Sequence, residues 1–267
     1  MNIGIIGTGN IASAVVTGFC KKGDGHTIFL SPRNAEKAAA LAAKFSEVQV
    51  CAANQEVLDN SEWIFISLHK KDFDALNELT FREDHKVVNM AAEMRLPDLK
   101  SRIGETALLA HAIPLPMIAN GYGPLIVYPE ITEIGELFSP IGDVIYAENS
   151  SDTRTLQLVT CLMSPYYMLL HEVAKFTDTQ NLDRDLSVNF LHSLFSSLSK
   201  RAAESPNCDL VELAHDMTPG GYNEQAMREL VSGGAIDMWG AALNRLMERL
   251  NSEQNVICDY LQKPMGS

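Results

Sequence analysis

A glycine-rich segment near the amino terminus carries the clearest chemical signal in this sequence. Gly7, Thr8 and Gly9 follow the apolar run Ile3–Ile6, and an apolar helical pattern, Ile11–Phe19, begins directly after them. Glycines at such a strand-to-helix turn let the backbone approach a diphosphate, whose charge is stabilised by free N–H groups at the start of the helix. The segment therefore predicts a dinucleotide-binding loop, made by Gly7, Thr8, Gly9, Asn10, Ile11 and Ala12.

The end of the second predicted strand, Thr27–Leu30, indicates which dinucleotide this loop prefers. A site for NAD commonly has a carboxylate here, which binds the ribose 2′-hydroxyl. This chain instead has Ser31, Arg33 and Asn34. Ser31 and Asn34 can hydrogen-bond a 2′-phosphate and Arg33 can pair with its charge, so NADP is favoured over NAD. The alternative is that Arg33 is an ordinary solvated surface charge.

A sheet with crossover helices must position these residues, because short β-rich runs alternate with helical patterns in the first half of the chain. One such helix is predicted over Ala35–Phe45, with Asn34 as its N-cap. The alternation is typical of an α/β Rossmann domain with a doubly wound, mostly parallel sheet, and we place this NADP-binding domain at residues 1–150. Eight strands are predicted, over Ile3–Ile6, Thr27–Leu30, Val48–Val50, Trp63–Ser67, Lys86–Asn89, Ala107–Ala112, Leu125–Tyr128 and Val144–Ala147.

The pattern becomes helical in the second part of the chain, where residues 151–267 are expected to form an all-α domain for substrate binding and dimerisation. Many apolar residues lie on its helices, so part of their surface is expected to pack against another copy of the chain. We therefore expect a homodimer or a higher homo-oligomer. The last residues, 263–267, are expected to form a disordered tail. Helices are predicted over Thr153–Phe176, Asp185–Ala203, Asn223–Val231 and Ala235–Leu261.

The bulk properties argue against several kinds of partner. The net charge of −13 disfavours binding to nucleic acid or to an anionic membrane. The five cysteines include no Cys-x-x-Cys pair and the seven histidines are dispersed, so reduced thiols and no metal site are predicted. The sequence starts without a basic leader and has no apolar run of membrane-spanning length. We therefore expect a cytoplasmic protein that binds a small-molecule substrate.

Four further segments resemble pyrroline-5-carboxylate reductases, which reduce a cyclic imine to proline with a nicotinamide dinucleotide. Ile64–Lys70 is similar to the apolar strand of that family that ends in Ala-Val-Lys-Pro. Val87–Glu93 resembles its Ser-Ile-Ala-Ala-Gly segment, and Ala112–Pro116 resembles its Met-Pro-Asn-Thr-Pro loop beside the nicotinamide. The resemblance implies that six further residues contact the cofactor: Leu68, His69, Lys70, Ala91, Ala92 and Pro114.

The fourth segment, Met217–Asn223, resembles the signature Ser-Pro-Gly-Gly-Thr-Thr of the same family. In that family this loop and the start of the following helix help to hold the substrate carboxylate, a role that suits a helix N-terminus. The resemblance implies a catalytic role for Thr218, with Tyr166 as a proton donor or a wall of the site. Thr218 is alternatively a helix cap, and Tyr166 a core residue. The implied substrate contacts are Gly220, Gly221 and Asn223.

The resemblance is looser around the substrate than around the cofactor. Tyr222 and Asn223 stand where the family has two threonines, and Met163 and Tyr166 stand where it has small residues. Larger side chains are expected to reshape or close a pocket for a five-membered ring. His111 occupies a position where the family often has arginine.

Three functions stay open after this comparison of motifs. The leading one is NADPH-dependent reduction of a cyclic imino acid, 1-pyrroline-5-carboxylate to proline, a step of proline biosynthesis. The second is reduction of a different imine or carbonyl compound, and the third is binding of NADP without catalysis. His69 and His111 are either structural groups or acid–base groups in these functions.

Overall fold

The structure is a computed structural model that describes residues 1–205 and 209–251. The chain forms two compact units, Met1–Gln157 and Leu158–Ser267. The change from one unit to the other lies within helix α6 (Ser150–Val159), so the chain continues into the second unit as a helix.

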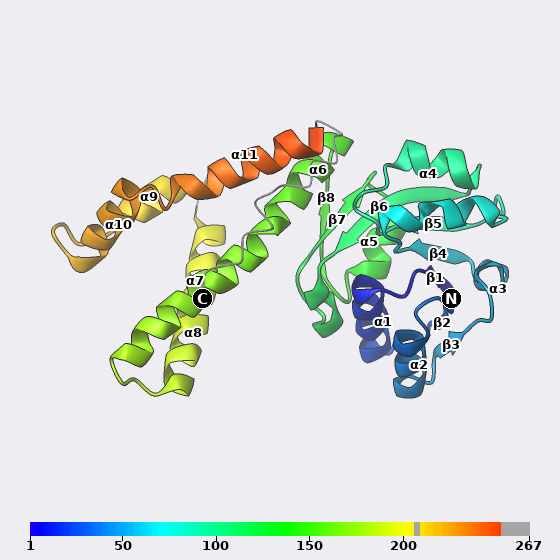
Figure 1. The fold of residues 1–267 in the computed structure, drawn as a ribbon, viewed down its shortest axis with the longest axis horizontal. Coiled ribbons are helices and arrows are strands. Elements are labelled where there is room, and N and C mark those ends of the chain that lie inside the picture. The colour runs from blue at the N-terminus through cyan, green and yellow to red at the C-terminus, as the bar shows by residue number, and fades with distance from the viewer. Residues whose placement is uncertain (206–208, 252–267) are drawn as a thin grey trace. The chain divides into compact units, whose positions relative to one another are not determined.

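The first unit is built on an eight-stranded sheet with the strand order β3-β2-β1-β4-β5-β6-β7-β8 (Figure 1). Strands β1 to β6 are parallel, β7 is antiparallel to β6, and β8 is parallel to β7. This topology confirms the predicted α/β Rossmann fold with a mostly parallel sheet. The strands are β1 (Asn2–Ile6), β2 (Thr27–Leu30), β3 (Val48–Val50), β4 (Trp63–Ile66), β5 (Lys86–Asn89), β6 (Leu108–Pro114), β7 (Pro124–Tyr128) and β8 (Asp143–Tyr146).

Helices cover both faces of the sheet, which is why its central strands are continuous apolar runs. One core contains residues of α1 (Asn10–Lys22), α2 (Ala35–Lys44) and α5 (Thr132–Phe138), and three rings of this core, Phe19, Phe65 and Phe138, pack against one another. The other core contains residues of α3 (Asn54–Asp59), the 3-10 helix η1 (Lys70–Glu78) and α4 (Leu96–Ile103). The two cores together bury Ile3–Ile6 of β1 and all of β4.

The sequence predicts the strands of this unit better than its short helices. Each predicted strand is present, and β6 extends two residues beyond its predicted end, to Pro114. Helix α1 continues to Lys22 and ends at Gly23, whose φ of 77° is left-handed. The elements α3, η1 and α5, together with the 3-10 helix η2 (Pro116–Asn120), have five to nine residues, which is too few for a clear helical period.

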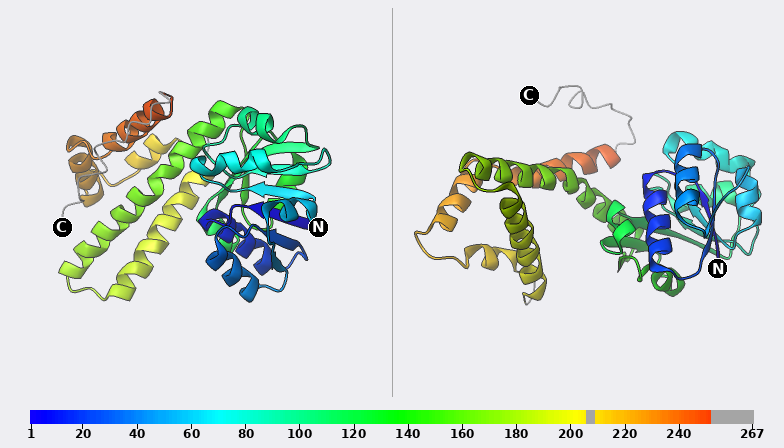
Figure 2. Two further views of the ribbon diagram at one scale, coloured as in Figure 1. Left: turned by 45° about the vertical axis from the view of Figure 1, so that its right-hand side comes forward. Right: turned by 90° about the horizontal axis from the view of Figure 1, so that it is seen from below.

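The described part of the second unit, residues 158–205 and 209–251, is helical. Helices α7 (Met163–Thr179) and α8 (Arg184–Glu204) form an antiparallel hairpin, visible in the left view of Figure 2. The hairpin buries Ala174, Ser187 and Leu191 between its arms, and the hydroxyls of Thr177 and Ser187 are hydrogen-bonded across it. The remaining helices are α9 (Leu210–His215), α10 (Tyr222–Ser232) and α11 (Asp237–Asn251).

Two predictions for this unit require correction. The single helix predicted over Thr153–Phe176 is interrupted by a 3-10 turn, η3 (Thr160–Leu162), which separates α6 from α7. Helix α9 lacks a counterpart among the predicted helices, because six residues do not establish a period. The predicted continuation of the last helix to Leu261 and the predicted tail at 263–267 lie outside the described residues. Throughout the described residues, no helix is both long and apolar enough to cross a membrane.

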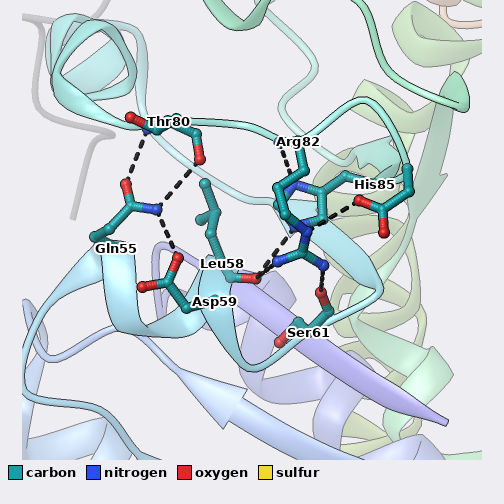
Figure 3. A network of polar contacts seen from close by, with 8 residues as sticks. Gln55, Leu58, Asp59, Ser61, Thr80, Arg82 and His85 are labelled. Atoms are coloured by element: carbon teal, nitrogen blue, oxygen red, sulfur yellow. Dashed lines mark hydrogen bonds and ion pairs between the residues drawn. The ribbon is translucent and has the colours of Figure 1, made fainter.

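A polar network at the amino ends of the strands ties α3 to the turn before β5 (Figure 3). The guanidinium of Arg82 donates to the carbonyl oxygens of Leu58 at 3.1 Å and Ser61 at 3.0 Å, and it pairs with Asp84 at 2.9 Å. His85 is fully buried and its Nδ1 accepts from the backbone N–H of Arg82, so its Nε2 donates to Leu58 O. Burial and the charge of Arg82 lower the pKa of His85, which keeps the ring neutral.

Replacement of Arg82 by alanine tests this network. Arg82→Ala leaves two carbonyl oxygens with fewer partners and lowers the free energy of unfolding by about 2 kcal/mol. Urea unfolding followed by the fluorescence of Trp63, which is only 4% exposed, measures the change in a Trp239→Phe background. As a control, Lys100→Ala removes an exposed pair with Glu105 and changes this free energy by less than about 0.5 kcal/mol. Equal effects of the two substitutions would show that the network is not stabilising.

Candidate functional site

The loops that follow β1, β2 and β4 enclose a cleft at the carboxyl edge of the sheet. Parallel strands bring their carboxyl ends to the same edge, which is where doubly wound proteins bind their ligands. The cleft has a volume of about 460 Å³. It is lined by Gly7, Thr8, Gly9, Arg33, Asn34, Ala35, Glu36, Ser67, Leu68, His69, Lys71 and Asp72.

Two glycines give the loop after β1 its shape. Gly7 has a φ of +97°, and a Cβ atom there would lie 2.5 Å from the carbonyl oxygen of Ser67, so a larger residue cannot occupy this position. A Cβ atom at Gly9 would meet none of the described residues within 4 Å. The backbone at Gly9 therefore faces open space, which a bound group can approach closely.

The loop leads directly into the amino end of α1. Gly9 is the N-cap residue of this helix, and no side chain among the described residues caps it. The N–H groups of the first turn, at Asn10, Ile11 and Ala12, have no helical acceptor. Together with the open space at Gly9, these donors fit the diphosphate of a dinucleotide.

Ser31 contacts the loop after β1 and does not line the cleft. Its side chain is buried, with only 1% of the residue exposed. Its hydroxyl oxygen instead accepts from the N–H of Gly7 at 2.9 Å, while the hydroxyl of Thr8 donates to the carbonyl oxygen of Ser31 at 3.2 Å. Ser31 and Thr8 therefore hold the loop after β1 against the end of β2.

Arg33 and Asn34 remain at the cleft. The side chain of Asn34 accepts from the N–H of Lys37 at 3.4 Å and caps α2, which confirms the predicted N-cap. The guanidinium of Arg33 is 55% exposed and pairs with the carboxylate of Asp72, with Nη2 and Oδ1 separated by 2.6 Å. Asp72 belongs to η1, and no local sequence pattern points to it, because its partner lies 39 positions earlier in the chain.

The other residues predicted to contact a cofactor fall into two groups. Leu68 and His69 line the cleft, as do the unpredicted residues Ser67 and Lys71. The rest of the predicted set does not line it: Asn10, Ile11, Ala12, Ser31, Lys70, Ala91, Ala92 and Pro114. Of these, Ala12, Ala91 and Pro114 are buried. These three residues can therefore contact a ligand only through the backbone, or support the site by packing beneath it.

A buried polar group supports the same edge at the ends of β5 and β6. Asn89 is fully buried, accepts from the N–H of Ala91 at 2.9 Å and donates to the carbonyl oxygen of Met94 at 2.7 Å. Its amide nitrogen also lies 3.3 Å from Nδ1 of His111, which is 8% exposed. Burial lowers the pKa of His111 to about 4, so the ring is neutral at neutral pH. His111 is thus a structural partner of the loop that carries Ala91 and Ala92.

The loop at the start of α10 holds the residues predicted to bind substrate. Thr218 does not cap this helix, because Gly221 is the N-cap residue and Thr218 is exposed. The N–H of Gly221 donates to the carbonyl oxygen of Thr218 at 3.0 Å. The N–H of Gly220 donates to the carboxylate of Glu224 at 2.6 Å, so both glycine N–H groups are already engaged within the loop. The Thr218 hydroxyl and Asn223 are the exposed polar groups that remain from the prediction.

Tyr166 lies near the beginning of α7 and is 37% exposed in the single chain. Its ring packs edge-on against Phe195 of α8, with centroids 5.9 Å apart, and beside the ring of Tyr167. The packing places part of Tyr166 in the hairpin and leaves the rest of the side chain accessible to solvent.

Comparisons with known proteins agree with this architecture. Residues 2–93 match the family described as "NADP oxidoreductase coenzyme F420-dependent". Pyrroline-5-carboxylate reductase of Pasteurella multocida (strain Pm70) is 23% identical over 246 residues, which cover 86% of this chain and 89% of the relative.

Two solved structures of such reductases share the fold. The enzyme of Streptococcus pyogenes has a TM-score of 0.81 at 18% identity, covering 94% of this chain and 98% of that one. The Plasmodium falciparum enzyme, solved with NADP bound, has a TM-score of 0.80 at 14% identity, covering 94% and 97%. These findings confirm the resemblance to pyrroline-5-carboxylate reductases that the sequence motifs indicated.

The neutral state of His111 predicts how stability depends on pH. Since burial lowers its pKa from 6.5 to about 4, protonation favours the unfolded chain. The contribution to stability is complete above pH 6.5 and is lost as the pH falls toward 4. In His111→Gln, whose amide oxygen can accept from Asn89, the loss of unfolding free energy between pH 7 and pH 5 is smaller by about 2 kcal/mol.

Urea unfolding at the two pH values, followed at Trp63 in the Trp239→Phe background, measures this difference. His192→Gln provides the control because His192 is exposed on α8, in the second unit. If the pH dependence of the unfolding free energy were unchanged in His111→Gln, protonation of His111 would not be what destabilises the folded chain at low pH.

Proposed function

We propose that this chain, which resembles pyrroline-5-carboxylate reductases over most of its length, is an NADPH-dependent reductase of a carbon–nitrogen double bond. The observation that carries the proposal is the loop at Gly7 and Gly9, which combines an open approach to the backbone with the amino end of α1, where no described side chain caps the helix. The substrate we infer is a cyclic imino acid, 1-pyrroline-5-carboxylate, whose reduction yields proline.

The carboxyl end of β2 supports NADPH rather than NADH as the donor. The loop at residues 31–34 contains no carboxylate for a ribose 2′-hydroxyl, and Arg33 presents an exposed guanidinium to the cleft. Arginine binds phosphate through a planar set of donors, so Arg33 would hold the 2′-phosphate, and the amide of Asn34 lies beside it. NADPH, when bound, supplies the hydride for the reduction.

The chain would contribute orientation more than acid–base chemistry. A cyclic imine is electrophilic when it is protonated, so a reductase of this kind mainly has to hold its substrate in a reactive orientation. The Thr218 hydroxyl and Asn223 are the groups that we assign to the substrate carboxylate. Tyr166 is assigned to a wall of the substrate site or to proton donation. Gly220 and Gly221 shape the loop that presents Thr218.

We also infer that the chain works as a homodimer or a higher homo-oligomer. Large apolar side chains on α8 are exposed in the single chain, among them Leu186 at 58%, Phe190 at 64% and Leu198 at 52%. Their exposure would cost free energy in water, and burial against another copy of the helical unit would remove it.

Sedimentation of the full chain tests the assembly. At micromolar concentration we expect a mass of at least twice the 29.4 kDa of one chain. Phe190→Glu, which places a charge on the exposed apolar side of α8, should shift the chain toward the monomer, whereas Glu172→Gln on the exposed surface of α7 should not. A monomeric wild-type chain would exclude this part of the proposal.

A second candidate function is the reduction of an imine that lacks a carboxylate. The observation that favours it is the contact between the N–H of Gly220 and Glu224. The carboxylate of Glu224 also pairs with Arg228, and both contacts lower its pKa, so the loop already holds a negative charge of its own. A charge at this position opposes a second carboxylate nearby and does not oppose an imine that lacks one, whether that imine is neutral or protonated.

The two candidate functions are separated by a matched pair of substrates. Oxidation of NADPH is followed by its absorbance with 1-pyrroline-5-carboxylate and with 1-pyrroline, which is the same ring without the carboxylate. Our proposal expects kcat/KM to be higher for the carboxylate substrate. It also expects Thr218→Ala to lower kcat/KM for that substrate by about 10-fold to 100-fold through loss of a hydrogen bond to a charged group.

The controls locate the defect in the substrate site. Thr218→Ser keeps the hydroxyl and should retain most of the activity, and neither variant should change the Kd of NADPH. Faster reduction of 1-pyrroline would instead support the second candidate. Tight binding of NADPH without turnover of either compound would point to a protein that binds NADP without catalysis.

A further inference from the structure

The ion pair between Arg33 and Asp72 brings a negative charge to the part of the cleft where a 2′-phosphate would bind. We propose that Asp72 restrains the preference of this chain for NADPH over NADH, by placing an anionic group against the arginine that recognises the phosphate. This inference rests on the proposed NADPH-binding function. It concerns Asp72 itself, which acts on the cofactor through Arg33.

The geometry of the pair allows Arg33 to bind Asp72 and a phosphate together. Asp72 contacts the guanidinium at Nη2, with a separation of 2.6 Å from Oδ1. A guanidinium has five N–H donors, so this contact leaves others that can face a ligand. The side chain of Arg33 is 55% exposed at the cleft, which makes these donors accessible. A phosphate on Arg33 would then lie close to the carboxylate of Asp72.

The carboxylate of Asp72 is poorly screened by solvent. Its side chain is only 12% exposed, and its backbone N–H donates to the carbonyl oxygen of His69 at 2.8 Å, which holds the first turn of η1 in place. The neighbouring acid at the cleft, Glu36, is exposed at the start of α2. Charges that are covered by protein interact more strongly than charges in water, so Asp72 should have the larger effect of the two.

The charges around the cleft are balanced without a ligand. Among its lining residues, Arg33 and Lys71 are positive, and Glu36 and Asp72 are negative. Both NADH and NADPH bring a diphosphate, which the amino end of α1 can stabilise. Only NADPH brings the additional phosphate, with a charge between −1 and −2 near neutral pH, to Arg33. The repulsion from Asp72 therefore acts mainly against NADPH and has little effect on NADH.

Replacement of Asp72 by asparagine separates its charge from its hydrogen bond. Asp72→Asn keeps the Oδ1 acceptor for Arg33 and removes the negative charge. We expect this variant to lower the Kd of NADPH by about fivefold, with a change of less than about twofold for NADH. Titration of the full-length protein with each nucleotide, followed by nicotinamide fluorescence, measures both constants without any turnover.

Two further variants serve as a second test of the charge and as a control. Asp72→Ser is also uncharged and should shift the NADPH constant in the same direction, so the test does not depend on one variant that folds. Asp74→Asn is the matched control, because Asp74 lies on the same η1, pairs with Arg102 and is 88% exposed. Its nucleotide constants should equal those of the wild type.

The outcomes distinguish this inference from the proposed function. Weaker or unchanged NADPH binding in Asp72→Asn would overturn the inference, because Asp72 would then orient Arg33 rather than oppose the phosphate. An equal gain for NADH would also overturn it. If the wild-type chain failed to bind NADPH at all, the proposed cofactor would be wrong and the inference would fall with it.

Discussion

The left-handed backbone at Gly7 is the constraint on which the nucleotide edge of this protein depends. At this residue the ends of three parallel strands meet: β1 ends just before it, its N–H donates to Ser31 after β2, and its Cα faces the carbonyl oxygen of Ser67 after β4. A side chain cannot fit between these strands. Because the chain turns so tightly here, α1 starts at the sheet edge with its N–H groups directed toward the cleft.

This arrangement distributes charge around the cleft in an unusual way. The helix end is positive through its peptide dipoles, while the side chains that line the cleft carry as many negative as positive charges. Binding of a diphosphate then depends on the backbone, and selection between dinucleotides depends on side chains. In our proposal Arg33 and Asp72 together adjust that selection, since one would attract the additional phosphate and the other would oppose it.

Two buried histidines with uncharged rings form hydrogen bonds at opposite ends of the strands. His85 joins the network of Arg82 at the amino ends of the strands (Figure 3). His111 contacts Asn89 at the carboxyl ends. Burial lowers the pKa of both rings, so each accepts or donates hydrogen bonds as a neutral group at neutral pH. At the carboxyl ends, next to the cleft, the hydrogen bond between His111 and Asn89 is therefore neutral, whereas the network at the amino ends also contains the charged pair of Arg82 and Asp84.

Local patterns in the sequence were sufficient for the fold class and the dinucleotide loop. Apolar runs separated by helical periods identified all eight strands of the first unit, and the two glycines before a helix identified the loop, because each signal is contained within about ten neighbouring residues. Short helices such as α3 and α9 carry too few residues for such a signal. The substrate-binding residues stay a prediction for a different reason, because the loop at Thr218 departs from the motif it resembles.

Contacts between distant residues required the tertiary structure. Ser31 has a hydroxyl group of the kind that binds phosphate, but this hydroxyl is directed inward to Gly7. Thr218 precedes a helix whose N-cap residue is Gly221. Arg33 has a cationic side chain that the sequence places at the cleft, yet its pairing with Asp72 depends on how β2 and β4 lie beside β1. The type and spacing of residues thus determined which elements form. The packing of those elements decided which side chains face a ligand, because burial and charge pairing depend on neighbours that are remote in the chain.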